Sequence, residues 1–163
     1  MRTLSYSMLP AACLLLTSTL FAQTPAINKE TTRKIIAAVD AGNAEAFAAY
    51  LSPNFDEHMP MPEEMKGMSD VEASKTMIAG YHKAFPDSKT DIQKMVAEGD
   101  VVMIYSIWSG TNTGEFMGMP PTNKPVKMDQ VDIIRFDASG KAIEHWGVYD
   151  NLAMMEQLGM MSK

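Results

Sequence analysis

The chain has 163 residues, 46% of them hydrophobic, and its 20 acidic and 14 basic side chains give a net charge of −6. This length is sufficient for one domain with its own hydrophobic core. The acidic balance argues against a nucleic acid or an anionic membrane surface as the partner, because both are themselves negatively charged.

The first 22 residues resemble a secretory signal peptide. Arg2 supplies positive charge, and the apolar stretch MLPAACLLLTSTLF (8–21) precedes Ala22. This stretch is too short to be a membrane-spanning anchor. We therefore expect cleavage after Ala22 and a mature protein in the periplasm or the medium.

Cleavage would leave residues 23–163 as a single domain that does not associate with membranes. The one cysteine of the chain, Cys13, would be removed with the leader. The mature domain would then be stabilised by its hydrophobic core and not by disulfides.

The first half of the domain predicts helices. After a short leader at 24–28, residues 29–42 place apolar side chains at helical spacing and end on a glycine. Residues 44–53 predict a second helix, which Pro53 ends. The sequence Ser-Asp-Val-Glu at 69–72 is a capping box for a third helix that continues to Phe85 and turns Tyr81 inward.

The second half predicts strands. Residues 90–111 indicate two strands joined by a tight turn at 98–100, and residues 125–150 indicate two more that turn at 137–141. The Gly- and Pro-rich residues 112–124 between them predict a loop, and the last 13 residues a short helix. Helices followed by antiparallel strands predict an α+β domain, with a curved sheet wrapped over the helices.

The register of the second hairpin selects candidate residues. With a turn centred near Ser139, facing residues have numbers that sum to about 278, within a slip of one or two. Asp132 then faces Trp146, and Gln130 lies on the same face as both. A slip of one residue would select His145 in place of Trp146.

Two interpretations of this face remain open. It could line a ligand cavity, where burial would raise the pKa of a carboxyl such as Asp132 and suit it to acid–base chemistry. The polar residues of the hairpin could equally mark a wet face, held by a cross-strand ion pair of Arg135 with a carboxylate. A bulge near Gly147 could also bring His145 and Asp150 together.

Other polar and sulfur-containing residues are less specific. His58, in the extended stretch FDEHMP, could face a pocket or the solvent. Methionines gather at 58–68 and 154–161. Thioethers beside an imidazole suit Cu(I), whereas the alternative is that they fill an irregular core.

Several motifs together resemble a known family. In order they are AFPD, AEGD, GTNTGEFMG, RFDASGK and EHWGVYD, and the resemblance extends from about Phe55 to Gly159. This set is similar to that of the SnoaL-like polyketide cyclases, often labelled ester cyclases, which have the NTF2-like fold. The resemblance implies a cone-shaped sheet closed by helices around a pocket, and homodimers packed through the outer sheet face.

The resemblance also implies chemistry. Cyclases of this family close a ring by aldol condensation without metal or organic cofactor, using an acid and a histidine on the last hairpin. In our placement these two positions fall at Asp132 and Trp146. We expect Asp132 to be the acid or base, with His145 and His58 in reserve. The residues expected to bind the ligand are Trp108, Met117, Trp146, Gln130 and Tyr81.

The leading hypothesis is an exported ester cyclase-type protein. It would bind a small hydrophobic carbonyl compound and act on it by cofactor-free aldol cyclisation, isomerisation or hydrolysis. The alternatives are a non-catalytic binder with the same pocket and a Met-rich periplasmic copper binder.

Overall fold

The computed structural model describes residues 16–161, with side chains from residue 25 onward. The expected leader lies mostly outside this range, and so does Cys13. Helix α1 (Leu16–Asp40) passes through Pro25 without interruption, so the short leader predicted at 24–28 is helical instead. None of the helices in the described part of the chain has the length and apolar character needed to cross a membrane.

The predicted second helix is largely wrong. Helix α2 (Ala44–Ala48) spans only five residues, and strand β1 (Leu51–Glu57) follows it. Pro53 lies inside β1 and is exposed. A proline is tolerated there because β1 is an edge strand, so an N–H can be missing without breaking a ladder on both sides. The chain then makes a short 3-10 turn, η2 (Glu63–Met65).

The third predicted helix is confirmed. Helix α3 (Asp70–Ala84) begins after Ser69, whose hydroxyl accepts the backbone N–H of Glu72 at 3.3 Å. This bond satisfies one of the free N–H groups at the helix start.

The four predicted strands are also confirmed. They are β2 (Lys89–Glu98), β3 (Val101–Thr111), β4 (Pro125–Phe136) and β5 (Ala142–Tyr149), each antiparallel to the next. Strand β1 adds to β5 in parallel, so the sheet order is β1-β5-β4-β3-β2. Helix α4 (Asn151–Leu158) follows β5.

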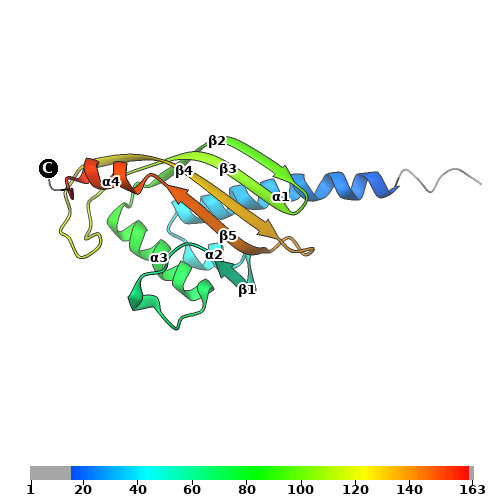
Figure 1. Ribbon diagram of the computed structural model, residues 1–163, viewed down its shortest axis with the longest axis horizontal. Helices are drawn as coiled ribbons and strands as arrows, with labels where there is room; N and C mark the ends of the chain where they lie inside the picture. Colours follow the sequence, from blue (N-terminus) through cyan, green and yellow to red (C-terminus); the bar gives the residue numbers. More distant parts are fainter. Residues whose placement is uncertain (1–15, 162–163) are drawn as a thin grey trace, which may run out of the picture.

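The result is the α+β architecture expected from the sequence. A curved sheet packs with one face on α1, α2 and α3, and α4 continues from the end of β5 (Figure 1). The opposite face of the sheet is open, and Met103, Tyr105 and Val148 on it are each more than a third exposed.

Two apolar clusters occupy the helix-facing side of the sheet. One contains Ile134 and Phe136 from β4, and the other contains Val126 and Met128 from the same strand. The inward residues between them on β4 are Gln130 and Asp132. A polar layer therefore separates the two halves of the core, and the candidate site lies in this layer.

Candidate functional site

A bulge in β5 decides which side chains enter the polar layer. Phe136 pairs with Ala142, but the next pair is Arg135 with Glu144, so Ile143 is an extra residue on β5. Beyond it, Asp132 pairs with Gly147 and not with Trp146. The predicted facing pair is thus wrong by one residue, and the one-residue slip is the register that the structure has.

This register places His145 and Tyr149 beside Asp132 on the inner face. Asp132 is only 7% exposed, and its Oδ1 lies 3.2 Å from His145 Nε2 and accepts the Tyr149 hydroxyl at 2.7 Å. Oδ2 has a longer contact, 3.4 Å from Gln130 Nε2. One carboxylate oxygen is therefore saturated, while the other keeps capacity for a further donor.

Glu57, at the end of β1, is the second carboxylate of this cluster. Its Oε1 and Oε2 lie 2.9 and 2.8 Å from His145 Nδ1. The parallel pairing of Glu57 with His145 puts both side chains on the same face. The imidazole is thus held between Glu57 and Asp132, in the sequence Glu57–His145–Asp132–Tyr149, which we call the polar chain.

The polar chain controls the protonation of its members. Burial works to lower the pKa of His145, but the hydrogen bonds and charges of Asp132 and Glu57 outweigh it and raise that pKa to about 9. The ring is therefore an imidazolium at neutral pH. Burial, together with the Asp132 charge, raises the pKa of Tyr149 well above its ordinary value, so Tyr149 stays a neutral hydrogen-bond donor.

The absence of a side chain at Gly147 leaves room for Met59 and Tyr149 beside the polar chain. A Cβ there would lie 2.5 Å from Met59 Sδ and 2.9 Å from the Tyr149 ring. Both distances are shorter than any van der Waals contact, so the side chains of Met59 and Tyr149 lie directly against the Gly147 backbone.

Trp146 and His58 lie elsewhere. Trp146 points to the opposite face from its neighbour His145, so the prediction that it lines the interior is wrong. Its indole stacks on the His58 ring, with centroids 4.3 Å apart and planes 5° apart. On the same face Arg135 Nε donates to Glu144 Oε2 at 3.0 Å. The outer face thus holds the cross-strand ion pair that was the alternative interpretation of this hairpin.

Of the remaining predicted residues, some are buried on the inner side of the sheet and others lie away from the polar layer. Trp108 is buried, and Tyr81 packs edge-on against it at 6.4 Å, in a cluster with Phe85 and Phe116. Met117 is 72% exposed at the tip of a tight turn, so its predicted place in a cavity wall is wrong. Asp150 does not reach His145 but caps α4, accepting the Ala153 N–H at 3.0 Å.

Sequence reasoning missed two members of the polar chain, Glu57 and Tyr149. Glu57 was not selected because its partner is 88 residues away in the chain and no local pattern links the two. Tyr149 could have been found, since the one-residue slip that selects His145 also turns Tyr149 inward.

Ser106, on the inner face of β3, adds a further polar group to this layer. It pairs with Gln130 across the strands and is fully buried, and its hydroxyl has no hydrogen-bond partner within the described residues. A buried hydroxyl without a partner is costly, and a water molecule or a ligand group would satisfy it.

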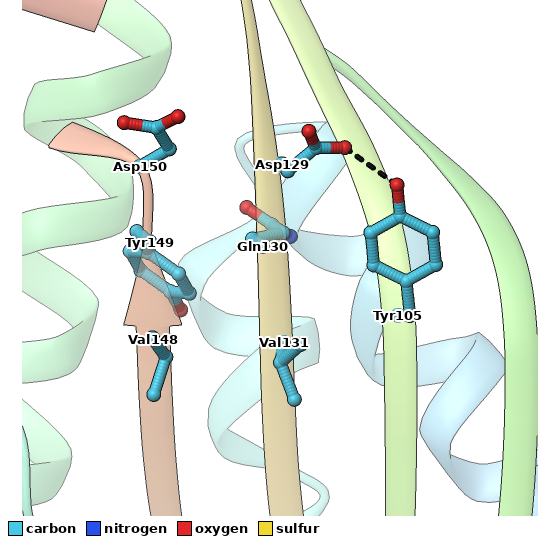
Figure 2. A pocket seen from close by; sticks show the side chains of 7 residues that line it. All are labelled: Tyr105, Asp129, Gln130, Val131, Val148, Tyr149 and Asp150. Atoms are coloured by element: carbon cyan, nitrogen blue, oxygen red, sulfur yellow. Dashed lines mark hydrogen bonds between the residues drawn. The ribbon is translucent and has the colours of Figure 1, made fainter. Parts of the chain in front are cut away.

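Two depressions on the surface of the described residues do not reach the centre of the polar layer. One, of about 270 Å³, lies on the outer sheet face beside Tyr105 and Asp129, which are joined by a 2.7 Å hydrogen bond, and Gln130 and Tyr149 from the edge of the polar layer also line it (Figure 2). The other, of about 440 Å³, lies near Asp87 and Gln157. Neither is lined by Asp132 or His145.

Part of the C-terminal methionine-rich segment packs into the core. Within residues 16–161, no group of three His, Cys, Asp or Glu side chains is placed to hold a metal ion. Met154 is 2% exposed in the second apolar cluster, against which Met160 also packs. In the C-terminal segment these two methionines therefore fill core volume.

Comparison with known proteins identifies the class of this fold and site. The sequence pattern of the SnoaL-like polyketide cyclases matches residues 29–158, and the chain belongs to this family. The observed architecture is the NTF2-like one that the resemblance implied. No protein with a curated function matches the sequence.

Solved structures support the same assignment. The chain is similar to AclR from Streptomyces galilaeus, described as a candidate hydroxylase, at 28% identity and TM-score 0.73, covering 85% of this chain and 84% of AclR. It is also similar to IdmH from Streptomyces antibioticus, described as a candidate polyketide cyclase, at 29% identity and TM-score 0.70. The match covers 81% of this chain and 98% of IdmH. A candidate polyketide cyclase from Acidithiobacillus ferrooxidans is similar at 29% identity and TM-score 0.71, and the match covers 83% of this chain and 96% of that protein.

Proposed function

We propose that the chain binds a small, mostly hydrophobic carbonyl compound against the polar layer and acts on it by cofactor-free acid–base chemistry. The observation that supports this most directly is the position of Asp132. Its carboxylate is buried on the inner face, next to an imidazolium and a neutral phenol, and its Oδ2 retains hydrogen-bonding capacity.

The polar chain gives each residue a role. Asp132 Oδ2 would accept a proton from a carbon beside the carbonyl group. As negative charge develops on the carbonyl oxygen, the positive charge of the His145 imidazolium would stabilise it, and the Tyr149 hydroxyl, which donates to Asp132 Oδ1 in the free protein, would turn to donate to it once Asp132 is protonated. Return of the proton from Asp132 to a different carbon would give isomerisation. Attack of the enolate on a second carbonyl, with return of the proton to the alkoxide that forms, would give aldol cyclisation.

The surroundings of the layer favour an apolar ligand. The aromatic cluster of Tyr81, Phe85, Trp108 and Phe116 lies on one side, and the apolar cluster that contains Ile134 and Phe136 lies on the other. The unpaired Ser106 hydroxyl offers a further polar anchor. The reaction type is our proposal, because similar structures include a candidate hydroxylase as well as candidate cyclases.

The test compares two carboxylates on the same strand. Asp129 lies on the outer face of β4, and Asp132 lies on the inner face. Proton exchange and turnover would be followed by NMR across a panel of small cyclic and aromatic ketones. We expect Asp132→Asn to lose about 100-fold or more in rate and Asp129→Asn to retain it. Unchanged turnover in Asp132→Asn would remove Asp132 from the mechanism.

The alternative is a binder without turnover. The double hydrogen bonding of Asp132 Oδ1 supports it, since the two donors beside the carboxylate are already engaged and are not free for a ligand oxygen. In that case native mass spectrometry should detect a retained small molecule, and the ketone panel should show binding without exchange.

Export is a further part of the proposal. Cleavage after Ala22 would leave Thr24 and Pro25 near the new N-terminus. Thr is favoured as a helix N-cap and Pro as the first helical residue, so the shortened α1 would begin with residues suited to a helix start. N-terminal sequencing of the protein recovered from a periplasmic or culture fraction would test this, with Gln23 as the expected first residue.

We also propose that the chain is a homodimer formed through the outer sheet face. Val148 is 70% exposed, Val96 60% and Met103 42% on this face, which is a large amount of apolar surface for a sheet in water. Sedimentation velocity should show a dimer that Val148→Asp dissociates. Leu152→Asp, at an equally apolar exposed site on α4, should leave the dimer intact.

A further inference from the structure

We propose that Glu57 is the positioning residue of the site: it fixes the ring orientation and the tautomer of His145, so that Nε2 faces Asp132. Its meaning for catalysis rests on the proposed function, but the geometry and its test do not. Glu57 comes from the edge strand β1, outside the hairpin that carries the other three members of the polar chain.

The contact geometry supports this role. Both Glu57 oxygens lie within 2.9 Å of His145 Nδ1, whereas His145 Nε2 lies 3.2 Å from Asp132. An ionised carboxylate can only accept, so Nδ1 must carry a proton to bond with it. When the ring loses a proton, the shorter and doubly accepted bond to Glu57 should keep the Nδ1 proton, so Nε2 becomes the basic nitrogen.

Glu57 is itself held in place. Its Oε1 accepts the Met59 backbone N–H at 3.0 Å, and its own backbone N–H donates to Asp70 on α3 at 2.9 Å. The backbone N–H of His58 donates to His145 O at 2.9 Å, which joins the two strands next to the contact. The Glu57 side chain is 10% exposed, so water competes little for its oxygens.

The charges around the ring make the effect of Glu57 measurable. The titratable groups that face His145 are Glu57 from β1, Asp132 from β4 and Tyr149 from β5, and Asp70 from α3 stands behind Glu57. Removing one of two carboxylates leaves the imidazolium with a single counter-charge in a buried site. Its proton should then be held less tightly.

The experiment is a ¹⁵N NMR titration of the His145 ring, which requires no substrate. In the unsubstituted protein, we expect a pKa of about 9 and, above it, a neutral ring with the proton on Nδ1. In Glu57→Gln, we expect the pKa to fall by at least about 1 unit and the tautomers to mix. Glu57→Asp, which restores the charge on a shorter side chain, should recover part of both effects.

The matched control is Asp56→Asn, the neighbouring acid on β1, whose side chain is 61% exposed. It should leave the His145 pKa and tautomer unchanged. Three outcomes would overturn the inference: a neutral ring protonated on Nε2 in the unsubstituted protein, an unchanged pKa in Glu57→Gln, or equal shifts in Glu57→Gln and Asp56→Asn. If Glu57→Gln does not fold, the inference is still tested by the tautomer of the neutral His145 ring in the unsubstituted protein and by the His145 pKa in Glu57→Asp. Loss of turnover in the ketone panel would concern the proposed function alone.

Discussion

Raising the pH should destabilise the domain, because only the folded state keeps His145 protonated above neutral pH. The folded pKa is about 9, against about 6.5 for a histidine in an unfolded chain. Below the unfolded pKa both states hold the proton, so the stabilisation is fully present. It is lost progressively as the pH rises from the unfolded pKa through the folded one.

The size of this effect follows from the two pKa values. They differ by about 2.5 units, and each unit corresponds to about 1.4 kcal/mol, so the loss is on the order of 3 kcal/mol. This is a large share of the roughly 5–15 kcal/mol by which a domain is typically stable.

The assay is urea denaturation followed by circular dichroism, at pH values from about 6 to about 9.5. The upper limit avoids titration of tyrosines in the unfolded chain, because the pKa of Tyr149 is also raised and would add a second loss above about 10. Gly80→Ala, which changes no titratable side chain, should keep the same pH dependence, and His145→Asn should remove it. A free energy of unfolding that stays level or rises across this range would refute the protonated ring and with it the polar chain.

Other substitutions test the packing around the site. Gly147→Ala should destabilise the domain by about 1–3 kcal/mol in urea denaturation, because the new Cβ would meet Met59 and the Tyr149 ring. Gly80→Ala, in the α3 interior with open space around it, should instead stabilise the domain by about 0.5–1 kcal/mol, and a loss would contradict this account. Asp150→Ala should lower stability by about 0.5–2 kcal/mol through loss of the α4 cap while leaving the His145 pKa at its original value.

Local signals in the sequence predicted most of the fold. The Ser69 cap, the turn at 98–100 and the turn at 137–141 each depend on residues within a few positions of one another, and all three occur as expected. Strand β1 was missed for the opposite reason. It pairs in parallel with β5, about 90 residues later, and no local pattern specifies that partner.

The candidate site was predicted in part, and the error has one cause. The sum of 278 assumed for facing residues holds for Phe136 and Ala142, next to the turn. The extra residue Ile143 changes the sum to 279 for every later pair, and a one-residue change exchanges the two faces of a strand. Asp132 was thus placed correctly on β4, while Trp146 was chosen where His145 stands.

The most direct test of the central claim is to ask where a carbonyl ligand contacts the protein. The side-chain NMR signals of His145 would be followed during titration with the ketone panel, with Tyr105 on the outer face as reference. The account predicts that a bound ketone shifts His145, leaves Tyr105 unchanged, and loses this effect in Asp132→Asn. Shifts confined to Tyr105 and its neighbours in the outer depression, or no shift at His145 with any ketone, would contradict it.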